Sequence, residues 1–288
     1  MVQAVAAGIG VMPWRLSLEV GAALGDAVRI AGVRRAVAAG NLAQAFPEWS
    51  LEERERVLAD HYRELGRVAC EYVRLPELAH AAPGEVIAQV HGMEHLIAAH
   101  DAGRGALLVT GHFGNFELGA AYLGRRHPVD MVVKPLANPG VEAWIAERRR
   151  RAGVGMIPLG AGVRRVFEAL RQNRWVALLA DQDAKSRGVF VPFLGRPSST
   201  PVGPAEIALR TGAPLIMGFM HRRADGRHEL EVLPPLVASE TDGDPALLLT
   251  ARHAACLEAW IRRHPANWLW LHRRWKSAPP AAESAGAA

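Results

Sequence analysis

Residues 105–123 have the sequence Gly-Ala-Leu-Leu-Val-Thr-Gly-His-Phe-Gly-Asn-Phe-Glu-Leu-Gly-Ala-Ala-Tyr-Leu. The run from Ala106 to Thr110 is apolar or β-branched, which is typical of a short strand buried on both faces. A glycine ends this run, and Asn115 is a suitable N-cap for a helix that begins with the next residue. His112 and Glu117 are therefore predicted to flank a turn between a strand and a helix.

A turn at this position can carry catalytic groups, because open α/β sheets bind their ligands at the carboxyl ends of parallel strands. The start of the helix offers unpaired N–H groups and the positive end of a dipole, which suit a developing oxyanion. His112 can remove a proton from an alcohol if a second group fixes its tautomer, and Glu117 is one turn away. We expect a base with its orienting acid; the alternative is a hydrogen-bonded core histidine.

The composition indicates a folded protein of considerable size. The chain has 288 residues, of which half are apolar, so it can form one large α/β domain or one domain with a helical appendage. Cys70 and Cys256 are its only cysteines and lie far apart in the sequence. A disulfide framework and a cysteine metal site are thus excluded, and a reducing compartment is indicated.

The order of apolar runs and turn residues predicts the secondary structure. Residues 1–75 have a helical pattern throughout, with Ser50 and Glu53 forming a capping box before a long helix to about Val73. From Glu85 onward, strand and helix signals alternate. The expected strands are 86–90, 106–110, 130–134, 154–157, 176–180, 188–193, 215–220 and 229–233, and the expected helices include 94–101, 138–152 and 204–211.

This alternation predicts an α/β fold with a mainly parallel or mixed central sheet flanked by helices, a helical N-terminal region and C-terminal helices. We expect a helical region over residues 1–80, with possible membrane association, and an α/β domain over residues 81–276. Residues 277–288 are rich in proline and alanine, which predicts a disordered tail.

Basic residues are concentrated near the C-terminus. Residues 252–276 contain six arginines and lysines against Glu258 alone, together with four of the eight tryptophans. Such a segment could bind an anionic membrane surface or nucleic acid. The alternative is a helical region whose tryptophans are in the core and whose arginines are solvated.

Several further polar residues are candidates for binding. Arg148 to Arg151 lie on one predicted helix, where at most two of them can address one site. Ser199 and Thr200 could contact a phosphate, although turn formation is the simpler role. Asp181 and Asp183 follow a buried strand as Asp-Gln-Asp, which is the metal-binding pattern of many glycosyltransferases. The other interpretation is a carboxylate that braces an active-site arginine or loop.

Five motifs together resemble the late acyltransferases of lipid A biosynthesis, a family that also includes phosphatidylinositol mannoside acyltransferases. The resemblance extends over residues 41–276. The motifs are Asn41-Leu-Ala-Gln-Ala-Phe-Pro, Gly111-His-Phe-Gly-Asn-Phe-Glu117, Asp181-Gln-Asp183 with Gly188-Val-Phe-Val-Pro-Phe-Leu-Gly-Arg-Pro, Leu209-Arg-Thr-Gly-Ala-Pro, and Trp268-Leu-Trp-Leu-His-Arg-Arg-Trp275.

The resemblance implies transfer of an acyl chain from acyl carrier protein or acyl-CoA to a hydroxyl of a membrane glycolipid. A lipid A precursor is favoured, and the alternative acceptor is a phosphatidylinositol mannoside or another lysophospholipid. His112 and Glu117 match the catalytic pair of the family. Arg149 is the best match to an arginine of the second motif, although Arg148 or Arg151 could hold that place. Asp181 matches an acidic residue of the third. No metal or organic cofactor is expected.

We expect His112 to activate the acceptor hydroxyl, Glu117 to stabilise the charged imidazole, and N–H groups near Gly114 and Asn115, with Arg149, to bind the oxyanion. Relatives usually carry a hydrophobic N-terminal anchor, whereas residues 1–14 here are interrupted by glycine and proline. The expected location is therefore the cytoplasmic face of the bacterial inner membrane, with peripheral or weak attachment. Nucleic acid is not an expected partner.

Overall fold

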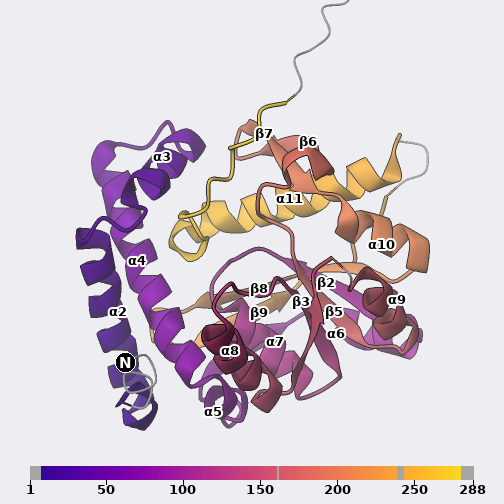
Figure 1. Cartoon of the computed structure of the whole chain (residues 1–288), viewed down its shortest axis with the longest axis horizontal. Helices are drawn as coiled ribbons and strands as arrows, with labels where there is room; N and C mark the ends of the chain where they lie inside the picture. Colours follow the sequence, from indigo (N-terminus) through magenta and orange to yellow (C-terminus); the bar gives the residue numbers. More distant parts are fainter. Residues whose placement is uncertain (1–7, 161, 239–242, 280–288) are drawn as a thin grey trace, which may run out of the picture.

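The computed structural model describes residues 8–160, 162–238 and 243–279. It confirms the predicted fold class: a seven-stranded sheet of order β1-β9-β8-β2-β5-β3-β4 lies between two layers of helices (Figure 1). The strands of this sheet are β1 (Ile87–His91), β2 (Ala106–Thr110), β3 (Val129–Val133), β4 (Val154–Pro158), β5 (Trp175–Leu179), β8 (Leu215–Arg222) and β9 (His228–Val232).

The sheet is mixed rather than fully parallel. The five strands β8, β2, β5, β3 and β4 run in the same direction, while β9 is antiparallel to β8 and β1 is parallel to β9. Thr110 at the end of β2 lies opposite Leu179 at the end of β5. The residues that follow these two strands therefore leave the sheet at the same edge, which we call the carboxyl edge.

Alternate residues of the central strands face two separate cores, as expected for strands buried on both sides. Leu107 and Val109 of β2 belong to one core, and Ala106 and Leu108 belong to the other. The first core is covered by α9 (Val163–Arg171), α10 (Gly203–Thr211) and α11 (Pro245–Arg263), and the second by α5 (Leu75–Ala79), α6 (Met93–Asp101) and α7 (Phe116–Gly124) (Figure 1). The helix α8 (Pro139–Arg151) lies beside β4 and α5.

The N-terminal helices are α2 (Trp14–Ile30), α3 (Arg35–Ala45) and α4 (Leu51–Val73), which stand together at one side of the molecule (Figure 1). The predicted capping box of α4 is present: Ser50 accepts from Glu53 N, and Glu53 accepts from Ser50 N. In the part of the chain that the structure describes, no helix has both the length and the hydropathy needed to cross a bilayer. The predicted disordered tail falls almost wholly on residues 280–288, outside the described residues.

One predicted element has a different place from the one expected. The strand at 188–193 is β6 (Gly188–Phe193), which pairs with β7 (Arg196–Pro201) in a separate hairpin outside the main sheet. The sequence of β7 predicts a loop, because Pro197 and Pro201 cannot donate to a ladder. Leu194 and Gly195 form the turn, with φ of 50° and 74°. Leu194 tolerates this conformation because it is buried and donates its N–H to Glu258, at 2.6 Å.

Candidate active site

His112 and Asp181 meet at the carboxyl edge of the sheet. Each lies two residues beyond the end of its strand, and the strands β2 and β5 are neighbours. His112 Nδ1 lies 2.8 Å from Asp181 Oδ1, and the His112 backbone N–H donates to Asp181 Oδ2 at 2.9 Å. The carboxylate therefore fixes both the ring and the main chain of His112.

Asp181 is itself held from a third side. Its side chain is 3% exposed, and Trp268 Nε1 donates to Oδ2 at 2.8 Å. Burial raises the pKa of this carboxyl, but the charge of His112 and the hydrogen bonds from His112 and Trp268 outweigh burial and lower the pKa to about 2. Asp181 is thus ionised at neutral pH, and its carboxylate accepts a hydrogen bond from the Nδ1–H group of the imidazole.

The opposite nitrogen of His112 remains accessible. The side chain is 29% exposed, and the nearest polar side chain to Nε2 is Gln182, whose Nε2 lies 3.5 Å away. Burial lowers the pKa of His112, but the charge and hydrogen bond of Asp181 outweigh burial, with a smaller contribution from Glu117, so the pKa is raised. An imidazole with Nδ1 donating to a carboxylate and Nε2 open is arranged as a general base.

Glu117 has a different partner from the one predicted. Its carboxylate accepts from Arg149 Nε at 3.0 Å and from Arg149 Nη2 at 2.5 Å, and both side chains are largely buried. The orienting acid of His112 is instead Asp181. The reason is topological: Asp181 comes from the neighbouring strand at the level of His112, whereas the first turn of α7 directs Glu117 toward α8.

The structure also separates the four consecutive arginines. Only Arg149 of the four pairs with Glu117 in the first turn of α7, whereas its neighbours on α8 have other partners. Arg148 lies over the ring of Trp144, Arg150 pairs with Glu147 in the next turn, and Arg151 lies 4.0 Å from Glu77.

The backbone N–H of Gly114 and the side chain of Asn115 have partners within the protein. Gly114 has a φ of 53° and lies so close to β8 that an added Cβ would be 1.7 Å from Met220 O, so only glycine fits. Its N–H donates to Asn267 O at 2.8 Å, which corrects the prediction that it binds the oxyanion. Asn115 caps α7 through Leu118 N and donates from Nδ2 to Glu71.

The residues after α11, which we call the C-terminal segment, contact the backbone at His112 and Phe113 and are partly buried in the core. Leu269 N donates to His112 O, and Trp268 pairs with Phe113 as an isolated bridge. Trp260, Trp268 and Trp270 are at most 4% exposed, so these tryptophans do not form the membrane-facing surface that the sequence allowed.

Arg274 is also buried, donating to Ser199 O and Thr200 Oγ1. Ser199 in turn donates to Lys185 O. Ser199 and Thr200 are therefore structural.

Asp181 and Asp183 do not form a shared site. Asp181 faces His112, whereas Asp183 accepts from Ser277 Oγ at 3.0 Å and from Lys185 N at 3.3 Å. Among the described residues, no group of three or more histidine, cysteine, aspartate or glutamate side chains is placed to hold a metal ion. The arrangement does not support the glycosyltransferase alternative.

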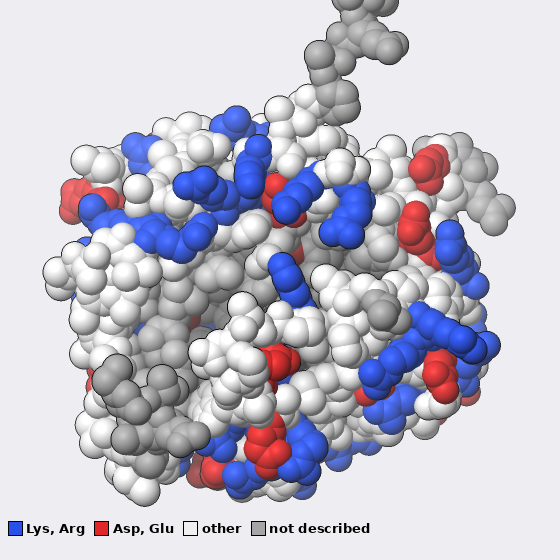
Figure 2. Space-filling view, in the orientation of Figure 1, with Lys and Arg blue, Asp and Glu red and all other residues white. Residues whose placement is uncertain are grey.

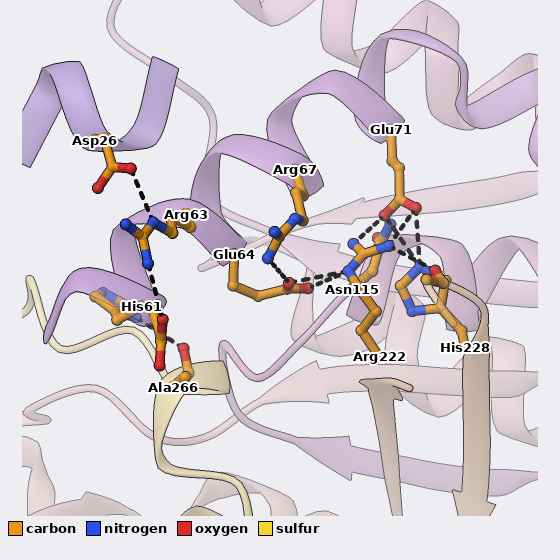
Figure 3. Close-up of polar contacts among 12 residues, drawn as sticks. Asp26, His61, Arg63, Glu64, Arg67, Glu71, Asn115, Arg222, His228 and Ala266 are labelled. Carbon is orange, nitrogen blue, oxygen red and sulfur yellow. Dashed lines mark hydrogen bonds and ion pairs between the residues drawn. The ribbon is translucent and has the colours of Figure 1, made fainter. Parts of the chain in front are cut away.

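A buried ionic network around Glu71, which includes the N-cap residue of α7, could not be predicted from the sequence. Glu71 of α4, which is fully buried, receives hydrogen bonds from Arg222 Nη2, Asn115 Nδ2 and His228 Nε2 at 2.8 to 3.0 Å (Figure 3). Burial raises the pKa of Glu71, but the charges and hydrogen bonds of His228 and Arg222 outweigh burial and lower it. The network ties α4 to β8, β9 and the start of α7, and its partners lie up to 157 residues apart.

A surface cavity of about 340 Å³ lies away from His112, between β3, β4 and α9. Its lining includes Asp130 and Arg174, which pair with each other near the amino ends of β3 and β5. This cavity is at the opposite edge of the sheet and does not contribute to the His112 site.

Comparison of the sequence with known proteins places the chain in a family. The model of the bacterial lipid A biosynthesis acyltransferase family matches residues 1–277. A phosphatidylinositol mannoside acyltransferase of Mycolicibacterium smegmatis is 31% identical over 91% of this chain and 88% of its own length.

A lipid A biosynthesis lauroyltransferase of Escherichia coli is 30% identical over 96% of this chain and 92% of its own length. A lipid A biosynthesis palmitoleoyltransferase of the same organism is 30% identical over 85% and 80%. With these relatives over its length and an oriented imidazole at the carboxyl edge, the chain belongs to the bacterial lipid A biosynthesis acyltransferase family and is an acyltransferase.

Proposed function

We propose that the protein transfers an acyl chain from an acyl thioester, on acyl carrier protein or coenzyme A, to a hydroxyl of a membrane glycolipid. The observation that carries this proposal is the His112–Asp181 pair, with Nδ1 bound to the carboxylate and Nε2 open. The relatives named above act on lipid A or on phosphatidylinositol mannoside, two sugar-containing lipids, and both match this chain at similar identity.

In the proposed reaction, Nε2 of His112 takes the proton of the acceptor hydroxyl as its oxygen attacks the thioester carbonyl. Asp181 holds the ring in the tautomer that leaves Nε2 unprotonated and stabilises the imidazolium that forms. The tetrahedral intermediate then collapses, and the imidazolium gives its proton to the leaving thiolate. A positioned base of this kind is typically worth about 10² to 10⁴ in rate.

Glu117 and Arg149 support this reaction as a fixed pair next to the base. Glu117 is in the first turn of α7, so its ion pair with Arg149 locks the helix that begins four residues after His112. Negative charge developing on the thioester oxygen would lie near the positive end of this helix dipole. We keep Arg149 as a candidate for substrate contact, because its guanidinium faces the site while its neighbours face away.

We also propose peripheral attachment to the cytoplasmic face of the inner membrane. The supporting observation is α2, which presents four large apolar side chains to solvent beside the exposed Arg15 and Glu19. Leu16, Leu24, Val28 and Ile30 are each more than 40% exposed. Gly21 and Gly25 face α4 and allow its backbone to approach so closely that an added Cβ would lie within 3 Å of it. The apolar side therefore points away from the protein, as in an interfacial helix.

The function is tested with the purified protein and its His112→Ala variant, using acyl carrier protein and CoA thioesters in turn with lipid A precursors and phosphatidylinositol mannosides. We expect the wild type to acylate one acceptor class, and His112→Ala to lose transfer by at least about 10²-fold. Circular dichroism and thermal unfolding show whether the variant remains folded. Wild-type turnover by a folded variant would remove the mechanism, and failure of every donor and acceptor pair would remove the function.

A further inference from the structure

The lysines of this chain have an unusual distribution. Arginine supplies all but three of its 34 basic side chains, and the three lysines are Lys134, Lys185 and Lys276. They lie in three separate segments, after β3, after β5 and in the C-terminal segment. All three are exposed.

Each lysine lies in a segment at the carboxyl edge, the edge at which His112 also leaves the sheet. The strand β3 pairs with β5 so that Met131 is opposite Ala177. Continued along the chain, this register puts Lys134 opposite Ala180, the residue before Asp181. Lys185 lies four residues after Asp181, in the turn η1 (Lys185–Arg187). Lys276 is brought next to this turn because its neighbour Ser277 donates to Asp183 Oδ2 at 3.0 Å.

Two arginines complete the group. Arg187 ends η1, and Arg273 follows His272, whose Nε2 accepts from Asp183 N at 3.1 Å. We call the set of Lys134, Lys185, Arg187, Arg273 and Lys276 the cationic rim. Basic side chains gather along the upper part of the face in Figure 2, over α3 and the β6–β7 hairpin.

The charge of the rim is not balanced by the protein. Within the described residues, none of its five members has a carboxylate oxygen within 4.0 Å, whereas the exposed Arg150 and Arg262 pair with Glu147 and Glu258. Asp183, two residues before Lys185, already accepts hydrogen bonds from Ser277 Oγ and Lys185 N. Five exposed cations without acidic partners create a positive field at the entrance to the base.

We propose that the cationic rim is a phosphate-binding site that holds a phosphate group of one of the two reactants beside His112. Lysine binds phosphate as a flexible point charge, which suits an anion at the end of a mobile ligand. This inference rests on the proposed function for the identity of the ligand, because acyl-CoA, acyl carrier protein and phosphoglycolipids all carry phosphate. The source is either the donor or the acceptor, and the experiment separates them.

The test uses Lys185→Gln/Lys276→Gln and, as a matched control, Arg104→Gln/Arg171→Gln. Both double variants remove two exposed positive charges that have no ion pair among the residues described by the structure. Arg104 precedes β2, and Arg171 ends the helix before β5, so both lie at the amino edge. KM is measured for acyl-CoA and for the acceptor glycolipid that the wild type uses.

We expect the rim double variant to raise one KM by about tenfold, equivalent to about 1.4 kcal/mol, with kcat little changed. A higher KM for acyl-CoA assigns the phosphate to the donor, and a higher KM for the acceptor glycolipid assigns it to the lipid. At about 1 M salt, where the Debye length is about 3 Å, the difference should largely disappear. Unchanged KM values for both reactants, or equal changes in the control, would overturn the proposal.

A second measurement is independent of turnover. Binding of adenosine 3′,5′-bisphosphate and of glycerophosphoinositol is measured by calorimetry on the full chain carrying His112→Ala, with and without the rim substitutions. We expect one of the two probes to bind, and to lose affinity by about tenfold when Lys185 and Lys276 are replaced. If neither probe binds, the phosphate site is absent even where acyl transfer is observed; if one binds but no transfer occurs, the proposed function fails and the site stands.

Discussion

At the scale of single residues, the site depends on two pairs of charged side chains, and the sequence suggests the wrong partner for His112. Glu117 is the acid nearest to His112 along the chain, yet Asp181, 69 residues away, supplies the hydrogen bond at 2.8 Å. Glu117 and Arg149 form the second pair, with at least two contacts between carboxylate and guanidinium. The base and the helix beside it are thus held by separate carboxylates.

Because Glu117 and Arg149 act as one unit, their substitutions should not be additive. We expect Glu117→Gln and Arg149→Gln each to lower kcat, since each leaves the other side chain buried without its partner. The double variant should be no slower than the slower single variant. Steady-state kinetics of the three variants give this coupling. Independent losses that multiply in the double variant would show that the two residues have separate roles.

At the scale of elements, α2 shows how one helix can have two apolar sides for different reasons. The side with Gly21 and Gly25 packs against α4, where Gly66 O lies 2.6 Å from the position of an added Gly21 Cβ. The other side exposes Leu24 and Val28 to solvent, at 48% and 41%. An exposed apolar helix face of this kind favours contact with a membrane.

We therefore expect Leu24→Glu/Val28→Glu to lose binding to vesicles that contain phosphatidylglycerol, because it places two acids in the apolar face. Val237→Glu/Leu247→Glu is the matched control, since these apolar residues are 68% and 40% exposed elsewhere. Co-sedimentation measures the bound fraction, and thermal unfolding should be similar in both variants. Equal binding of the wild type and the α2 variant would exclude this helix as the attachment surface.

Much of the element pattern could be predicted, because local signals decide it. The strand 106–110 and the helix with the Ser50 cap are found at the predicted bounds, since a two-sided apolar run and a capping box are readable from neighbouring residues. The β6–β7 hairpin could not be predicted in full, because Leu194 adopts a positive φ that only burial and the contact with Glu258 make tolerable.

At the scale of the whole molecule, the site is assembled from segments that the sequence does not connect. His112 follows β2, Asp181 follows β5, and Trp268 follows α11, so their contacts require the order of strands in the sheet. The motifs predicted which residues matter, but the partner of each residue depends on tertiary structure. The Glu71 network is the extreme case, since it joins α4 to β8 and β9 with no local pattern.

The central claim is that Asp181 orients His112 and raises its pKa, and the most direct test is the pH dependence of kcat for the wild type and Asp181→Asn. His112 must be neutral to accept a proton, so wild-type transfer should fall as the pH drops through its raised pKa. Without the Asp181 carboxylate, burial lowers that pKa and is opposed only by the smaller contribution of Glu117.

The acidic limb of the Asp181→Asn profile should therefore move to lower pH, and the maximal rate should fall by about 10² to 10⁴. Asp225→Asn, the same change at an exposed turn, should leave the profile in place. A profile of Asp181→Asn that coincides with the wild type in both position and height would contradict the account.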